Sequence, residues 1–297
     1  MNIETIRRQY AEEIRECAGL RSGPLVDAFA TVPRERFLGP GPWRIAAPDP
    51  VRWGEVSYEL TEDTNPAHVY RNVSVALNAD QNINNGHPET MALWLDALAV
   101  REGETVYHMG CGTGYYTAIL ATLVGPTGHV VALEVDPLLV AEATKALQPY
   151  GNVTVFAGDG ASFDPGAFDV ALINAGITSP PARWLHRLRD GGRMILPITA
   201  SMPDAGSGRN LSKGVVFIVE KRGHVYPVRI VTFTVIYSCT GLRSPALDRR
   251  IAQTMMHGRL GTVQSLRRDR HAAAESCWLH GDDFCFSFEP ALAETVQ

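Results

Sequence analysis

Three glycines at alternating positions, Gly110, Gly112 and Gly114, have the spacing in this sequence that most directly implies chemistry. The apolar run Val106–Met109 precedes them, and a helix-like run that begins at Tyr115 follows. This order predicts a buried strand, a tight turn and the start of a helix. Glycines in such a turn allow unusual backbone dihedrals and let a ligand approach closely. In α/β sheets, the first turn of this kind is where nucleotide-like ligands bind.

The spacing favours a ligand that carries adenosine but no pyrophosphate. The dinucleotide fingerprint needs its third glycine one position later, and that position is Tyr115. Glu134 lies 20 residues after Gly114, at the end of a second apolar run. A carboxylate at such a strand end can accept hydrogen bonds from both ribose hydroxyls. The pattern therefore indicates S-adenosyl-L-methionine as the cofactor.

Two later strand ends carry further candidate groups. Residues 153–157 predict a strand that leads into Gly158-Asp159-Gly160, where Asp159 would lie at the adenine edge, and residues 168–173 predict a strand that ends at Asn174. The cofactor-binding residues predicted on these grounds are Gly110, Gly112, Gly114, Glu134, Asp159, Gly160 and Asn174.

The alternation of strands and helical patterns predicts an α/β fold. We expect a Rossmann-like, doubly wound, mostly parallel sheet with helices on both faces, because parallel strands need right-handed crossovers. Gly191-Gly192 is interpreted as the stop of a helix before the fifth strand, which runs to Pro197. The predicted organisation is an N-terminal helical and loop covering segment (1–87), a cofactor-binding core (88–242) and a C-terminal extension (243–297). Smaller expected elements are a helix over 2–18, loops or short extended pieces over 39–66, a helix over 245–257 and a strand over 283–288.

At this point the sequence resembles a known family. Val32-Pro33-Arg34, with Phe37 three residues on, and Gln81-Asn82-Ile83-Asn84, with a helix-like run after it, are similar to motifs of the protein-L-isoaspartate O-methyltransferases. That family lies within the class I S-adenosylmethionine-dependent methyltransferases. The resemblance covers roughly residues 20 to 240. It implies direct transfer of a methyl group from the sulfonium of the cofactor to a nucleophile of the substrate.

The resemblance also assigns roles to three more residues. The family usually has a serine at the position of Asn84, near the incoming carboxylate and the donated methyl group. His87 follows in the same turn, so Asn84 and His87 are the predicted catalytic residues. The family usually has an acid at the position of His108, where it helps to hold the methionine end of the cofactor. His108 therefore joins the predicted cofactor-binding residues.

The acceptor stays open between three hypotheses. The first is a carboxylate on a peptide, a protein or a specialised metabolite, with a function diverged from isoaspartyl repair. The second is a small-molecule natural product with a phenol, amine or carbon acceptor, for which His87 or His108 could act as a base. The third is a non-catalytic cofactor-binding or interaction protein, which the intact glycines, Glu134 and Asp159 disfavour.

Composition narrows the expected partners and compartment. Of the 297 residues, 45% are hydrophobic and 20% charged, and the net charge of −5 argues against nucleic acid as the main partner. No apolar run is long enough for a membrane span, the first residues lack a signal-peptide pattern, and five cysteines without paired spacing indicate a reduced, cytoplasmic protein. Peptides or small molecules are the expected substrates, and the oligomeric state stays open. No metal is expected, because the spacing of four C-terminal residues fits no zinc pattern well: His271, Cys277, His280 and Cys285.

Overall fold

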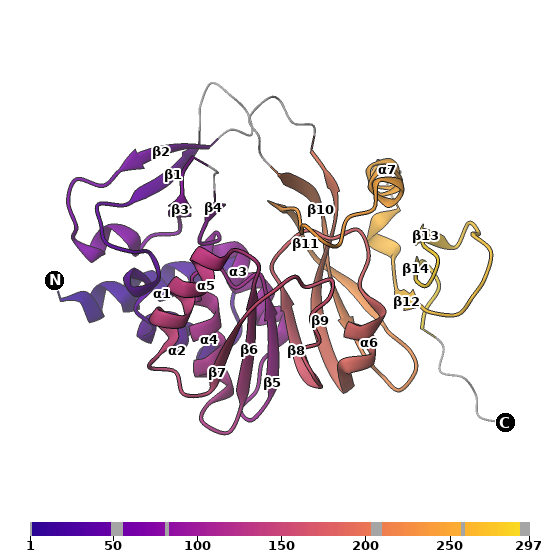
Figure 1. Ribbon diagram of the computed structural model, residues 1–297, viewed down its shortest axis with the longest axis horizontal. Coiled ribbons are helices and arrows are strands. Elements are labelled where there is room, and N and C mark those ends of the chain that lie inside the picture. Colours follow the sequence, from indigo (N-terminus) through magenta and orange to yellow (C-terminus); the bar gives the residue numbers. More distant parts are fainter. Residues whose placement is uncertain (1, 49–55, 81–82, 203–209, 257–258, 292–297) are drawn as a thin grey trace. The chain divides into compact units, whose positions relative to one another are not determined.

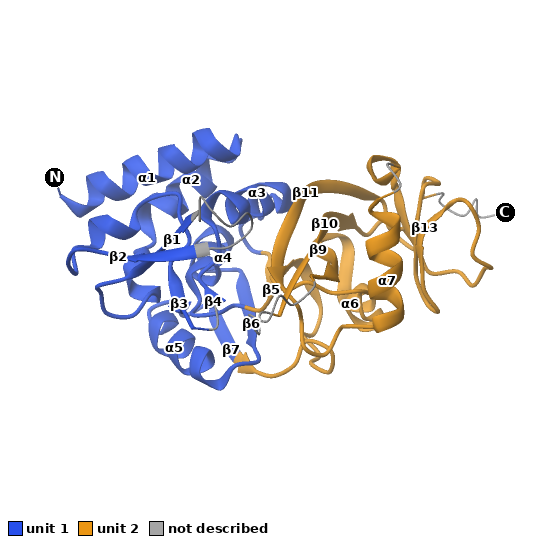
Figure 2. Ribbon diagram, turned by 90° about the horizontal axis from the view of Figure 1, so that it is seen from above, with its two compact units in different colours: residues 1–103, 111–155 blue, residues 104–110, 156–297 orange. Residues whose placement is uncertain are grey.

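The computed structural model describes residues 2–48, 56–80, 83–202, 210–256 and 259–291 (Figure 1). The chain divides into two compact units. Unit 1 comprises residues 1–103 and 111–155, and unit 2 comprises residues 104–110 and 156–297 (Figure 2). None of the helices in the described residues combines the length and apolar character that a membrane crossing requires.

Unit 1 contains the five α-helices that the structure describes before residue 150. Its elements are α1 (Ile3–Ala18), α2 (Gly23–Thr31), η1 (Arg34–Phe37), β1 (Arg44–Pro48), β2 (Val56–Leu60), η2 (Pro66–Val69), β3 (Ala76–Asn78), β4 (Ile83–Asn84), α3 (Pro88–Leu98), α4 (Tyr115–Val124), β6 (His129–Glu134) and α5 (Pro137–Leu147). Strand β7 (Val153–Ala157) begins in unit 1 and ends in unit 2.

Unit 2 contains most of the strands. Its elements are β5 (Thr105–Met109), β8 (Phe168–Ile173), α6 (Ala182–Arg187), β9 (Leu188–Ser201), β10 (Leu211–Glu220), β11 (Val228–Tyr237), α7 (Pro245–Thr254), η3 (Leu260–Thr262), β12 (Ser265–Arg267), β13 (Cys277–His280) and β14 (Cys285–Ser287).

The first helix, α1, has clear signals at both ends. The side chain of Asn2 accepts a hydrogen bond from the backbone N–H of Thr5 at 2.8 Å, and Gly19 ends the helix with a φ of +61°. The face that carries Tyr10 and Ile14 is fully buried. The amphipathic pattern over residues 2–18 therefore predicted this helix correctly.

Arg34, in the Val-Pro-Arg segment, organises the covering part of unit 1 from the inside. Its guanidinium is completely buried and donates to the backbone carbonyls of Val69 at 2.6 Å and Val73 at 2.6 Å. It also lies over the rings of Tyr10 and Tyr115, 5.6 and 5.9 Å from their centroids. A buried cation needs such partners, so Arg34 ties the first helix and the 69–75 segment to the start of α4.

The main sheet has seven strands in the order β11-β10-β9-β8-β5-β6-β7. Strand β5 pairs with β8 in parallel, and β8 pairs with β9 in parallel. Strand β10 pairs antiparallel with β9 on one side and with β11 on the other. Helices α4 and α5 pack on β6, and α6 and α7 pack on β9. This is the Rossmann-like α/β architecture that the sequence predicted. The strand order reverses at β5, and ligands of such sheets bind beyond the carboxyl ends at this switch point.

The interpretation of Gly191-Gly192 as a helix stop was wrong. Helix α6 already ends at Arg187, and both glycines lie inside the continuous strand β9. The register with β8 jumps there from Phe168↔Leu188 to Val170↔Arg193, which marks a bulge. Gly191 has a φ of +74°, and a Cβ on Gly192 would come within 2.7 Å of a carbonyl oxygen of β8. The glycines therefore serve the bulge.

The covering segment and the extension contain more strand than the sequence indicated. Within residues 39–66, which were expected to be loops or short extended pieces, β1 and β2 form an antiparallel hairpin. In the extension, the predicted helix and strand correspond to α7 and β14. Strand β14 lies between β12 and β13 in a three-stranded sheet. Phe286 of β14 stacks on Phe217 of β10, with centroids 4.9 Å apart, and this contact joins the small sheet to the main one within unit 2.

Candidate active site

The three glycines adopt the left-handed conformations that only glycine takes up readily. Their φ angles are +77° for Gly110, +57° for Gly112 and +96° for Gly114. A Cβ on Gly114 would lie 2.6 Å from Leu147, so this glycine lets α5 pack against the loop. Among the described residues, a Cβ on Gly112 would come within 4 Å of Leu77 alone, at 3.9 Å, so these residues leave space in front of Gly112. Helix α4 begins directly after the loop, and the dipole of a helix makes its N-terminal end favourable for electronegative ligand atoms.

Glu134 fixes the middle of this loop. Its carboxylate accepts hydrogen bonds from the backbone N–H groups of Gly112 at 2.8 Å, Val135 at 2.9 Å and Asp136 at 3.2 Å. The residue is 7% exposed. Each carboxylate oxygen has two acceptor positions. Val135 and Asp136 occupy both positions of Oε1, whereas Oε2 accepts only from Gly112 and retains one position for a ribose hydroxyl.

Two contacts within unit 1 hold the covering segment on the glycine loop. The hydroxyl of Thr113 donates to the carbonyl of Phe37 at 2.6 Å, and the ring of Phe37 packs on Tyr115 with centroids 5.8 Å apart. Phe37 ends the Val-Pro-Arg-x-x-Phe segment. That segment is therefore a support of the loop.

The turn that contains Asn84 is connected to the same helix. The Tyr116 hydroxyl, from α4, donates to the carbonyl of Gly86 at 3.2 Å. Asn84 ends β4, and its side-chain oxygen accepts a hydrogen bond from the hydroxyl of Tyr58 at 2.8 Å. Strand β4 pairs with β3, which carries Leu77, the neighbour of Gly112. The structure thus places Asn84 on β4, the strand that pairs with the glycine loop's neighbour β3. Gln81 and Asn82 of the same motif lie outside the described residues.

His87 precedes α3 as its N-terminal flanking residue and is exposed. Its pKa is lowered, mainly because packing around the ring displaces water; Glu89 opposes this shift and Arg34 adds to it. The imidazole is therefore mostly neutral at pH 7, which is the state that a base requires.

The unit 2 part of the predicted site is built on β5 and β8. Asn174, directly after β8, donates from its side-chain amide to the carbonyl of Gly110 at 3.2 Å and from its backbone N–H to Met109 at 2.8 Å. Gly160 lies against Met109, because a Cβ there would lie 3.0 Å from the methionine Cγ. Gly110, Asn174 and Gly160 therefore form one local cluster.

Asp159 begins the turn after β7. Its carboxylate accepts from the backbone N–H of Ala161 at 2.9 Å. Gly241, which follows β11, lies directly against this carboxylate, since a Cβ on Gly241 would overlap both of its oxygens. Sequence reasoning missed Gly241, because the contact joins positions far apart in the chain.

His108 differs from the other predicted binding residues because its side chain is completely buried in β5. Burial lowers its pKa to about 3, so the imidazole is neutral at physiological pH. Such a weakly basic group is a poor proton acceptor, so of the two histidines considered as bases only the exposed His87 stays a candidate.

Comparison with known proteins decides the family. The family model described as "Protein-L-isoaspartate(D-aspartate) O-methyltransferase (PCMT)" matches residues 58–225. The chain belongs to this family. Its curated relatives include the protein-L-isoaspartate O-methyltransferase of Ignicoccus hospitalis, 35% identical over 200 residues that cover 66% of this chain and 83% of the relative. Another is protein-L-isoaspartate O-methyltransferase 2 of Anaeromyxobacter sp., 30% identical, covering 77% of this chain and 83% of the relative.

Solved structures support the fold. A putative protein-L-isoaspartate O-methyltransferase from Plasmodium falciparum, in complex with S-adenosyl-L-homocysteine, has a TM-score of 0.59 at 15% identity and covers 79% of this chain and 98% of that one. The family membership makes the chain an S-adenosylmethionine-dependent methyltransferase. The residues present fit this cofactor: open space in front of Gly112 and a buried carboxylate with acceptor capacity at Glu134.

Proposed function

We propose that this methyltransferase esterifies the carboxylate of an aspartyl or isoaspartyl residue in a peptide or protein, and that it has diverged from general isoaspartyl repair. Family membership supports the reaction type, because the curated relatives are named protein-L-isoaspartate O-methyltransferases. S-Adenosylmethionine supplies an activated methyl group when bound. The protein then has to align the donor with the acceptor and exclude water.

The proposed division of work follows from the local geometry. In unit 1, Gly112 and Gly114 shape the loop, and Glu134 both fixes it and offers an acceptor to the ribose. In unit 2, the proposed binding residues are His108, Gly110, Asp159, Gly160 and Asn174. A carboxylate acceptor is already an anion at neutral pH, so the reaction needs no general base. Charge on the acceptor disappears as the ester forms, which makes orientation the main requirement on the acceptor side.

The contact between Tyr58 and Asn84 is the observation that supports divergence. Where the family usually has a serine hydroxyl, this chain has a larger amide whose oxygen accepts a hydrogen bond from a tyrosine of the covering hairpin at 2.8 Å. An amide with a fixed orientation has a different shape and a different set of donors from a freely rotating hydroxyl. We infer that the acceptor surface is matched to a narrower set of aspartyl-type carboxylates than a repair enzyme accepts.

His87 supports the second candidate, a small-molecule acceptor with a phenol or amine. These nucleophiles often need a base, and His87 is exposed and has a lowered pKa. The two candidates predict different products. A carboxyl methyl ester is cleaved by mild alkali and releases methanol, whereas an aryl methyl ether or a methylamine is stable under the same conditions.

The test is transfer of labelled methyl groups to a matched set of three peptides that differ at one residue: isoaspartyl, aspartyl and asparaginyl. We expect the label to be labile to mild alkali, the asparaginyl peptide to be inactive, and isoaspartyl turnover to be weak beside an authentic repair enzyme. Alkali-stable label on a metabolite panel would support the second candidate instead. Isoaspartyl turnover equal to that of the repair enzyme would contradict the proposed divergence.

A further inference from the structure

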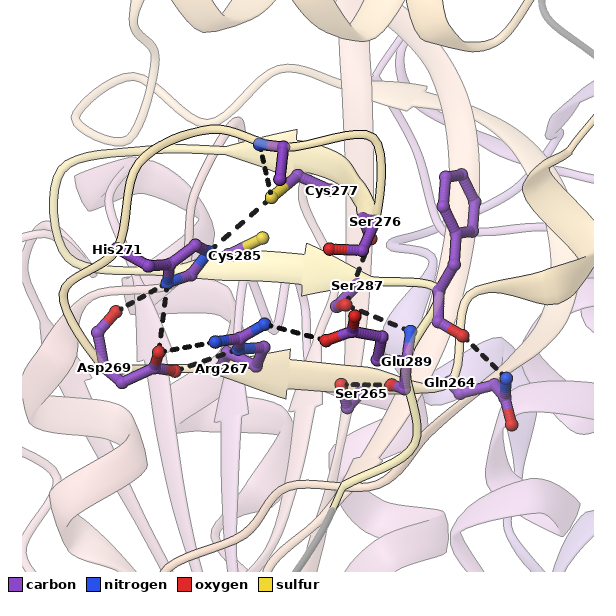
Figure 3. A network of polar contacts seen from close by, with 12 residues as sticks. Gln264, Ser265, Arg267, Asp269, His271, Ser276, Cys277, Cys285, Ser287 and Glu289 are labelled. Carbon is purple, nitrogen blue, oxygen red and sulfur yellow. Dashed lines mark hydrogen bonds and ion pairs between the residues drawn. The ribbon is translucent and has the colours of Figure 1, made fainter.

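Two histidines and two cysteines of the C-terminal extension converge on one point. His271, Cys277, His280 and Cys285 each offer one ligand atom, and these four atoms lie within 4.8 Å of one another. The residues come from the loop before β13, from the two ends of β13 and from the start of β14. Figure 3 shows three of them, His271, Cys277 and Cys285. The spacing His-x5-Cys-x2-His-x4-Cys matches no common zinc pattern, so the sequence alone favours an ordinary terminal segment here.

The sheet register explains how this unusual spacing produces a cluster. His280 and Cys285 are direct cross-strand partners in β13 and β14, so their side chains start from adjacent positions. The rings of His271 and His280 are 4.7 Å apart. His271 Nε2 lies 3.5 Å from Cys277 Sγ, and the backbone N–H of Ala274 donates to the same sulfur at 3.4 Å.

The dimensions agree with a tetrahedral ion. Bonds of about 2.3 Å to sulfur and about 2.0–2.1 Å to nitrogen put the ligand atoms of a zinc site roughly 3.3–3.8 Å apart. The 3.5 Å between His271 and Cys277 already falls in this range. The widest separation of 4.8 Å needs a contraction of about 1 Å, which rotation of side chains can supply.

Asp269 orients His271 as the outer partner of a metal-bound histidine would. The ring Nδ1–H donates to the backbone oxygen of Asp269 at 3.0 Å and lies 3.1 Å from its carboxylate. Arg267 holds that carboxylate with two hydrogen bonds, at 3.0 and 2.6 Å (Figure 3). With the proton kept on Nδ1, the lone pair of Nε2 points into the cluster. Carboxylate–histidine pairs of this kind fix the ring orientation in metal sites.

The ring of His280 gives an independent indication that an ion binds at this cluster. Its Nδ1 is buried and has no hydrogen-bond partner among the residues that the structure describes, although the residue's backbone carbonyl accepts from Arg250 of α7 at 2.9 Å. A buried ring nitrogen without a partner is costly unless something satisfies it. A metal ion bound through Nδ1 of this histidine would remove that cost.

We propose that the extension contains a structural Cys2His2 zinc site. Four protein ligands fill a tetrahedral zinc ion and leave no open position for a reacting water, so the site stabilises structure. The strands β12, β13 and β14 have only three to four residues each, so a structural zinc ion would add folding free energy to a small sheet. The zinc ion would tie the loop before β13 to β13 and β14, and the small sheet packs on β10 through Phe286.

The first test uses the full chain, expressed with added Zn2+ and purified without chelator. Elemental analysis should give one zinc per chain. Co2+ exchanged into the site should give the intense visible bands of tetrahedral cobalt and a thiolate-to-cobalt charge-transfer band. Two results would overturn the proposal: protein that contains neither zinc after expression with Zn2+ nor cobalt after exchange with Co2+, or a Cys277–Cys285 disulfide in the peptide map. The cobalt spectrum does not require any variant to fold.

The second test uses substitutions in pairs. Cys277→Ser and His280→Gln should lose stoichiometric zinc, while Cys17→Ser, which changes an exposed cysteine of α1, should retain it. Asp269→Asn should weaken zinc binding about 10- to 100-fold in competition with a chelator. Glu289→Gln is its control, because Glu289 pairs with Arg267 at 3.0 Å without touching His271. Equal affinity in the Asp269 and Glu289 variants, or zinc retained by both ligand variants, would overturn the assignment.

Discussion

The carboxylate of Glu134 accepts a hydrogen bond from the backbone N–H of Gly112 at 2.8 Å, and so joins the end of β6 to the middle of the glycine loop. Two other backbone N–H groups, of Val135 and Asp136, donate to the same carboxylate. Charge-assisted hydrogen bonds of this kind are stronger than neutral ones. The residue proposed to bind the ribose therefore also holds the loop that receives the cofactor.

Glu134→Ala should weaken binding of S-adenosylhomocysteine by about 2–4 kcal/mol, which is about 30- to 1,000-fold, because it removes hydrogen bonds to a charged group. Calorimetric titration measures the affinity. Asp136→Asn is the matched control: Asp136 caps α5 through the N–H of Leu138, and asparagine caps equally well. Unchanged affinity in a folded Glu134→Ala protein would rule out the ribose assignment.

Gly112→Val should abolish cofactor binding while the far-ultraviolet circular dichroism stays nearly native. Valine is disfavoured at a φ of +57°, and its branches would enter the space in front of the loop. Gly223→Val provides the control, because Gly223 has a φ of +61° and a Cβ there would meet nothing within 4 Å. Both variants carry similar backbone strain, so only the loss of binding should distinguish them. Equal cofactor affinity in the two variants would show that the loop does not receive the ligand.

The burial of His108 predicts a specific pH dependence of stability. The unfolded chain protonates this residue below its ordinary pKa of 6.5, whereas the folded protein does so only near its pKa of about 3. The folded state thus binds fewer protons between these values, and stability falls as the pH drops below 6.5. His108→Gln should remove this loss, so between pH 6.5 and 5.5 the wild type should lose about 1 kcal/mol relative to the variant, with the slope rising toward about 1.4 kcal/mol per pH unit at lower pH. Urea unfolding at pH 7.5, 6.5 and 5.5 measures the difference, and parallel stability curves would contradict the prediction.

The effect of His87→Gln on kcat/KM should distinguish a carboxylate acceptor from a phenol or amine acceptor. With a carboxylate acceptor, His87→Gln should change kcat/KM less than about 10-fold, because no proton has to be removed. A phenol or amine acceptor would lose about 10²- to 10⁴-fold and would also lose the acid limb of its pH–rate profile. His224→Gln, at an exposed turn of unit 2, controls for the loss of a histidine. A loss of the larger size would therefore exclude the proposed reaction.

The sequence predicted the glycine loop, the acid at the end of β6 and the succession of strands and helices in the core well, because these features depend on neighbours in the chain. The sequence did not predict features that depend on the register between paired strands. Gly191 and Gly192 look like a helix stop, but their role depends on how β9 aligns with β8. A local pattern does not contain that alignment, since a bulge is defined by the partner strand.

The cluster of two histidines and two cysteines is a second feature that depends on strand alignment and that the linear sequence did not predict. The linear spacing from His271 to Cys285 matches no common pattern, and the cluster exists because His280 and Cys285 face each other across two short strands. The contact between Tyr58 and Asn84 likewise joins residues 26 positions apart through the covering hairpin. Punctuation by Gly and Pro correctly indicated a non-helical segment there, but it does not specify which side chain the hairpin brings to the site.

The substitution that tests the acceptor side most directly is Asn84→Ser. If the amide narrows the acceptor range, restoring the hydroxyl that the family usually has should raise activity on an isoaspartyl peptide, because small improvements in positioning have large effects on rate. Tyr58→Phe is the informative companion, since it removes the hydroxyl that donates to Asn84 and leaves the ring and the amide in place. We expect Tyr58→Phe to reduce activity on the native acceptor without a gain on the isoaspartyl peptide, and cofactor affinity to stay constant in both variants. The measurement is kcat/KM for labelled methyl transfer to isoaspartyl and aspartyl peptides. No gain from Asn84→Ser in a protein with normal cofactor affinity would move the source of selectivity from residue 84 to other parts of the covering segment.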